Sequence, residues 1–158
     1  MNAVSNVTFA LLAVAGVTIF TASGLPAHAG TPAYFVFEQP PPADAVQKTN
    51  RFIFRLDDDK RIAEAREILK SGSKLHVQGT IETQKAPYNP EWSYVLSPAT
   101  ISFFENQIEV CDANMVHVEQ HLDEVGGSYL PHSHWCPWSS QLIEEVTDID
   151  PKTERLRP

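Results

Sequence analysis

The stretch that decides the fold reads Arg51-Phe52-Ile53-Phe54-Arg55-Leu56-Asp57-Asp58-Asp59. Its first six residues alternate, so that Phe52, Phe54 and Leu56 share one face, which predicts a strand with one side buried. The acidic triplet that follows predicts the start of a helix, because carboxylates there accept hydrogen bonds from free backbone N–H groups. The chain is therefore expected to pass from a strand directly into a helix.

Behind the triplet, apolar residues recur at helical intervals until Ser71-Gly72, which predicts that the helix ends there. These residues are Ile62, Ala65, Ile68 and Leu69. A calcium-binding loop is the alternative for the triplet. Counted from Asp57, however, Ile62 and Ile68 occupy the positions where that loop needs glycine and glutamate. We therefore assign the triplet to helix capping.

Most of the remaining segments have strand patterns and short connections. We expect further strands at 34–37, 75–82, 92–96, 101–104, 107–111 and 141–146. A second helix is expected over 113–125, with Asp112 as its N-cap and Gly126-Gly127 at its end. Short connections favour antiparallel pairing. The predicted architecture is α+β, a single domain in which one curved antiparallel sheet packs against two helices.

The first 30 residues contain no charged side chain, and 9–20 is an almost continuous apolar run. This run is too short to span a bilayer, and Ala27-His28-Ala29 offers small residues at the two positions that a signal peptidase reads. We therefore predict a signal peptide over 1–29, one domain over 30–147 and a flexible tail over 148–158. The expected location is secreted or periplasmic, and an uncleaved N-terminal anchor is the alternative.

The composition excludes several classes of protein. A hydrophobic share of 42% excludes a wholly disordered chain. With 12 basic and 20 acidic residues the net charge is -8, which argues against nucleic acid as the partner because phosphate binding depends on lysine and arginine. After residue 30 no apolar run approaches membrane length, so no membrane span is expected in the mature chain.

The two cysteines, Cys111 and Cys136, are expected to form a disulfide, because an exported protein matures in an oxidising compartment. The sequence Trp135-Cys136-Pro137-Trp138-Ser139 also resembles the nucleophile motif of thioredoxin-like proteins, which makes a thiol-redox protein one alternative function. Too few residues follow Cys136 to complete that fold, and no resolving cysteine follows it. A structural bridge is the preferred interpretation.

Four histidines fall close together near the end of the chain: His117, His121, His132 and His134. The first two are four residues apart, so they share one helix face and can chelate zinc or copper. A disulfide would return the loop that contains the other two towards this helix, which makes a third ligand possible. A metal-binding protein or metal-dependent enzyme is thus a second alternative, against a merely solvated helix face. Otherwise no cofactor is expected.

Aromatic residues gather in the irregular segment 128–140, where Tyr129, Trp135 and Trp138 flank Cys136. Rigid aromatic side chains are common anchors of recognition, and a loop stiffened by a disulfide loses less entropy on binding. Packing of the tryptophans on the disulfide is the alternative. The chain contains neither a Gly-x-Ser-x-Gly elbow nor a phosphate-binding glycine loop, so an enzyme is the less favoured class.

Three sets of residues also carry a resemblance. They are 54–66, then 88–94 with Glu109-Val110-Cys111-Asp112-Ala113, and 121–127 with Trp135-Cys136-Pro137-Trp138-Ser139-Ser140. Over about 33–146 the chain is similar to a family of small exported domains without an established activity. The resemblance implies a single secreted domain and a Cys111–Cys136 bridge, and it transfers no catalytic residue. The function expected is a non-enzymatic binding module for an extracellular protein or glycan.

Overall fold

The computed structural model describes residues 30–41, 43, 50–106 and 110–157. The predicted signal peptide, and most of the strand expected at 107–111, lie outside these residues. No helix among the described residues is long and apolar enough to cross a membrane.

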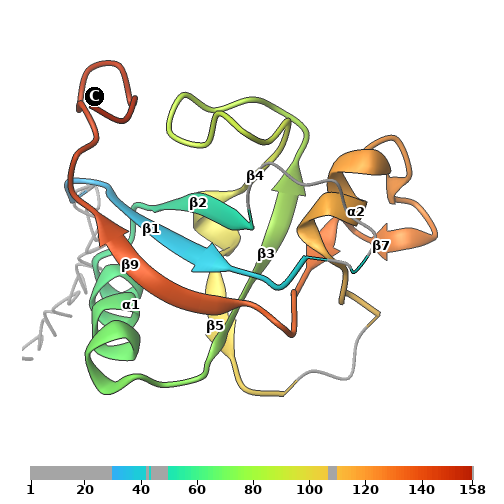
Figure 1. Ribbon diagram of the computed structural model, residues 1–158, viewed down its shortest axis with the longest axis horizontal. Helices are drawn as coiled ribbons and strands as arrows, with labels where there is room; N and C mark the ends of the chain where they lie inside the picture. The colour runs from blue at the N-terminus through green and yellow to red at the C-terminus, as the bar shows by residue number, and fades with distance from the viewer. Residues whose placement is uncertain (1–29, 42, 44–49, 107–109, 158) are drawn as a thin grey trace, which may run out of the picture.

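A three-stranded antiparallel sheet is built from the two ends of the domain, in the order β2-β1-β9 (Figure 1). Its strands are β1 (Ala33–Glu38), β2 (Arg51–Leu56) and β9 (Gln141–Val146). Phe35 pairs with Phe54, and Phe37 pairs with Phe52. All four rings are fully buried, which confirms the alternation predicted for 51–56. The central strand, β1, is buried on both faces.

A second sheet is organised around β3 (His76–Glu82), which Figure 1 shows crossing beside the first sheet. It pairs antiparallel with β4 (Val95–Leu96), β5 (Ser102–Phe104) and β8 (His134–Trp135). A 3-10 turn, η1 (Pro98–Thr100), joins β4 to β5. The remaining short strands, β6 (Val125–Gly126) and β7 (Tyr129–Pro131), pair parallel.

The α+β class and the dominance of antiparallel pairing are confirmed, but the strands in the described part of the chain form three separate sheets instead of the single curved sheet that was expected. The reason lies in the lengths of the strands after β3. Most of them pair over only two or three residues, because the turns at Pro98 and Pro137 interrupt any longer ladder.

The first helix, α1 (Asp59–Ser71), follows β2 as the sequence predicts. Asp58 is its N-cap, with its carboxylate accepting a hydrogen bond from the Arg61 backbone N–H at 3.0 Å. Gly72 ends it in the left-handed conformation at φ 68°, a region that glycine occupies without a steric penalty. The helix lies beside β9, and Arg66 forms two hydrogen bonds with Glu145.

The second helix is shorter than predicted: α2 covers Met115–Gln120 only. Its N-cap is Asn114, whose side-chain oxygen accepts from the Val116 N–H, so the assignment of Asp112 to this role is wrong. The Asp112 carboxylate instead accepts a hydrogen bond from the backbone N–H of Trp138. Turns follow α2 up to β6, because His121 already leaves the helical conformation at ψ 32°.

The core joins the sheets through aromatic rings. Phe37 and Phe52 contact Trp135 edge-on, with ring centroids 5.6 and 5.5 Å apart. The buried Gln39 extends this connection to α2, because its amide accepts from the Met115 N–H and donates to the Ala113 carbonyl. Three hydrogen bonds in all satisfy this side chain, the third going to Ser139.

The segment after β9 also contributes to the interior, which its polar composition did not predict. Ile149 packs in a small cluster with Tyr34, Tyr88 and Val95. Glu154 accepts hydrogen bonds from the Tyr34 hydroxyl and from the Arg55 guanidinium. The part of the predicted flexible tail up to Arg157 is therefore folded against β1 and β2.

Candidate functional site

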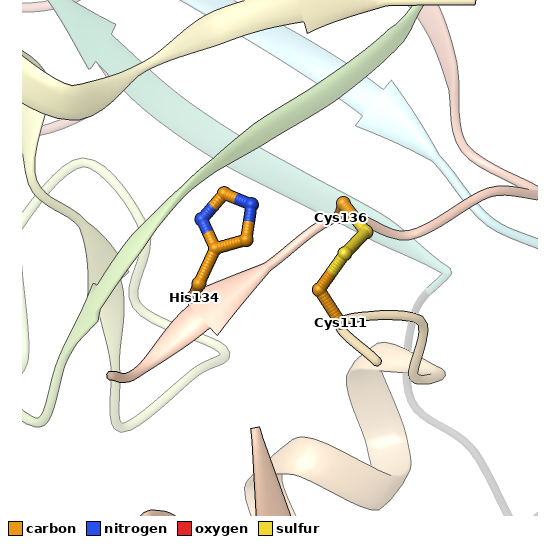
Figure 2. Close-up of side chains that lie close together, drawn as sticks. All are labelled: Cys111, His134 and Cys136. Atoms are coloured by element: carbon orange, nitrogen blue, oxygen red, sulfur yellow. A yellow bond between two sulfur atoms is a disulfide. The ribbon is translucent and has the colours of Figure 1, made fainter. Parts of the chain in front are cut away.

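Cys111 and Cys136 form a disulfide, as the sequence predicts (Figure 2). Both cysteines are buried, and the Cys136 backbone N–H donates to the Cys111 carbonyl at 2.9 Å. Neither cysteine is free. The bridge connects the segment before α2 to the aromatic loop at 128–140.

Backbone geometry within this loop is unusual in its first half. Leu130, His132 and Ser133 all have φ values between 47° and 58°, where residues with side chains are uncommon. Hydrogen bonds hold this conformation: the Ser133 N–H donates to the Leu130 carbonyl, and the Ser133 carbonyl accepts from Ile81 in β3. The loop is thus fixed to the second sheet before it reaches Cys136.

The three aromatic residues predicted to bind lie in different environments. Trp135 is completely buried, and its indole N–H donates to the Ala113 carbonyl at 2.9 Å. It is a core residue that packs with Phe37 and Phe52, and it cannot contact a partner in this conformation. Tyr129 is half-buried, and Trp138 is 37% exposed.

Trp138 is held both through its backbone and through its ring. Its backbone N–H donates to the Asp112 carboxylate at 2.9 Å, and its ring contacts Phe104 edge-on at a centroid distance of 6.0 Å. Phe104 packs in turn with the disulfide. Val110, next to Cys111, is 82% exposed. Phe104 is itself buried, and we call the two exposed apolar side chains that flank the bridged cysteines, Val110 and Trp138, the Trp138 surface.

The four candidate histidines do not gather at one point. His117 and His121 contact each other at a centroid distance of 4.6 Å, and both contact the ring of Tyr129. His134 lies in β8 beside the disulfide (Figure 2), while His132 lies in the turn between β7 and β8. A third ligand from His132 or His134 stays a prediction that this arrangement does not favour.

Within the described residues, the one group of three histidine, cysteine or carboxylate side chains with ligand atoms within 4.8 Å of one another is Cys111, His134 and Cys136. Its two sulfur atoms are bonded to each other, so neither is a thiolate that could bind a metal. In this oxidised state the group does not form a metal site.

Comparison with protein families matches residues 31–148 to the BP-74 N-terminal domain. The chain belongs to the BP-74 N-terminal domain family. The matched range covers every strand and both helices of the described structure, from β1 to β9. The comparisons with curated proteins and with solved structures gave no match.

In this member of the family, sequence patterns miss several residues that shape the site. They assign Asp112 to a helix cap and Phe104 to an ordinary strand, and they do not point to Gln39. The contacts that give these residues their roles are made to Trp138, to the disulfide and to Met115, all far from them in sequence. The one local signal is the position of Asp112 next to Cys111, which places it near any loop that the disulfide attaches.

Proposed function

We propose that this protein is an exported, non-enzymatic binding module that recognises another extracellular protein through the Trp138 surface. The observation that carries the proposal is the exposure of Trp138 on a loop whose backbone is fixed next to a disulfide. Tryptophan is enriched among the residues that dominate binding energy at protein interfaces.

Rigidity of the loop supports this function. A partner that binds a mobile loop must also order it, which costs roughly 0.5–1.5 kcal/mol for each side chain immobilised. Around Trp138, the Asp112 hydrogen bond, the Ser140 N–H bond to the Pro137 carbonyl and the contact with Phe104 already restrict the loop. Most of this ordering is therefore complete before a partner arrives.

The chemistry of the surface favours a protein over a glycan. Val110 is aliphatic and strongly exposed, and it adds apolar area that a partner side chain can cover. A sugar would stack on the indole of Trp138 but would gain little from an aliphatic neighbour. Export itself rests on the apolar segment at 1–29, and N-terminal sequencing of the secreted protein should find Gly30 first.

The test is the capture of partners by the immobilised protein from the extracellular fluid of its source, followed by measurement of Kd with the purified partner. Trp138→Ala should weaken binding at least tenfold. Leu156→Ala is the matched control, because it removes another exposed apolar side chain, 43% exposed, on the C-terminal segment. Equal binding by wild type and Trp138→Ala, or binding only to a glycan array, would contradict the proposal.

A further inference from the structure

The rings of His117, His121 and Tyr129 form a cluster on the face of α2 that is turned towards β7. The two imidazoles are nearly perpendicular, at 86°, and the Tyr129 ring lies 5.8 Å from the first and 6.0 Å from the second. His117 is exposed and His121 is half-buried, so an ion can reach the cluster from solvent. Tyr129 was not among the metal ligands that the sequence suggested.

The hydroxyl of Tyr129 is buried, and among the described residues it has no hydrogen-bond partner. Buried hydroxyls in folded proteins nearly always have a hydrogen-bond partner, so one without a partner calls for an explanation such as a functional role. The Tyr129 hydroxyl is therefore free to act as a ligand of an ion. The two imidazoles that contact it are groups that bind metals well.

Glu124 supports the same interpretation. Its carboxylate lies 3.2 Å from Nδ1 of His121, three residues earlier in the chain. Histidines that bind metals commonly donate their second ring N–H to a carboxylate, which fixes the tautomer and leaves the other nitrogen for the metal. In His121 this arrangement leaves Nε2 as the metal-binding atom.

The separations of the three ring centroids lie within the range that ligands of a single ion can have. Metal–nitrogen bonds are about 2.0–2.1 Å and metal–oxygen bonds about 2.0–2.2 Å. For angles at the metal between 90° and the tetrahedral value, these bonds place the centroids of two imidazoles roughly 4.5–5 Å apart, and those of an imidazole and a phenolate roughly 5–6 Å apart. The observed distances are 4.6, 5.8 and 6.0 Å.

Among the divalent first-row metals, a site of nitrogen and oxygen ligands generally has its highest affinity for copper(II). We propose that His117, His121 and Tyr129 bind one copper(II) ion, with Glu124 as the positioning residue for His121. Tyr129 binds as the phenolate and releases its proton to the buffer. The site is independent of the Trp138 surface.

The test is titration of the tag-free full chain with copper(II) chloride, followed by calorimetry and visible absorption. Wild type should bind one ion and show the phenolate-to-copper charge-transfer band. His117→Gln should weaken binding about 100-fold. Tyr129→Phe should weaken it about tenfold and abolish the band, which a merely structural tyrosine would not do.

His76→Gln is the matched control. It makes the same substitution at an imidazole of β3 whose ring contacts Phe104 and lies outside the cluster. This variant should bind copper as wild type does, and circular dichroism verifies that every variant is folded. Equal affinity of wild type and His117→Gln, persistence of the band in Tyr129→Phe, or tighter binding of zinc than of copper would overturn the proposal.

Discussion

At the scale of the residue, the tyrosines are the groups whose acid–base behaviour the fold changes most. Burial raises the pKa of Tyr34 and of Tyr88 to about 12, and the nearby Glu154 carboxylate acts in the same direction on both. Burial also raises the pKa of Tyr94 and of Tyr129. These four are the complete set of tyrosines in the chain.

The raised pKa values predict a loss of stability in alkali. In the unfolded chain a tyrosine has a pKa of about 10, so between pH 10 and 12 the unfolded chain loses phenol protons that the folded chain keeps. The tyrosine contribution to the free energy of unfolding should be complete below pH 10 and decrease as the pH rises towards 12. Denaturant titrations at several pH values measure this change.

Absorbance of tyrosinate provides the direct check on the same prediction. The folded protein should show little tyrosinate at about pH 10, whereas the protein in denaturant should show about half of its tyrosines ionised. A folded protein in which Tyr34 or Tyr88 ionises with a midpoint near pH 10 would contradict the burial described for these two rings.

At the scale of the element, α1 depends on its N-cap. Asp58→Ala removes the acceptor of the Arg61 N–H and should lower the free energy of unfolding by about 1 kcal/mol. Asp58→Asn keeps a capping oxygen and should cost much less. Chemical denaturation of both variants measures the difference, and equal stability of the two would mean that the cap does not stabilise the helix.

The sequence predicts elements best where their cause is local. The alternation of Phe52, Phe54 and Leu56 and the capping of α1 by Asp58 and Gly72 depend on neighbours in the chain, and these predictions are confirmed. α2 ends earlier than its apolar spacing suggests, and Asp112 forms its bond with Trp138 across the disulfide. The separation into several sheets likewise depends on pairings between distant segments, which periodicity does not encode.

For the candidate sites too, the sequence predicts what depends on neighbours in the chain and misses what depends on contacts between distant segments. The sequence places His117 and His121 on one face, and the structure brings them into contact. It could not distinguish the buried Trp135 from the exposed Trp138, because both flank Cys136 and only the register of β8 against β3 turns the first ring inwards. The Tyr129 ring reaches the histidines only through the turns after α2.

At the scale of the whole molecule, the disulfide joins the segment before α2 to the loop that carries Trp138. Loss of a native bridge in a small secreted domain typically costs about 2–5 kcal/mol. Cys111→Ala with Cys136→Ala should therefore lower the free energy of unfolding by about this amount, measured by denaturant titration against wild type. An unchanged midpoint in the double variant would show that the buried contacts around Phe104 hold the loop without the bridge.

The pairing of β1 with β9 sets the order in which this molecule can be completed. The central strand of the first sheet is made from the start of the domain, and one of its two neighbours is the last strand of the domain. Local elements such as β2 and α1 can form while synthesis continues, but closing this sheet requires the ends of the domain to meet. The domain therefore reaches its native state only after residue 146 has left the ribosome. Until then the backbone N–H and C=O groups along one edge of β1 are unpaired, and a chaperone can bind this edge during that period.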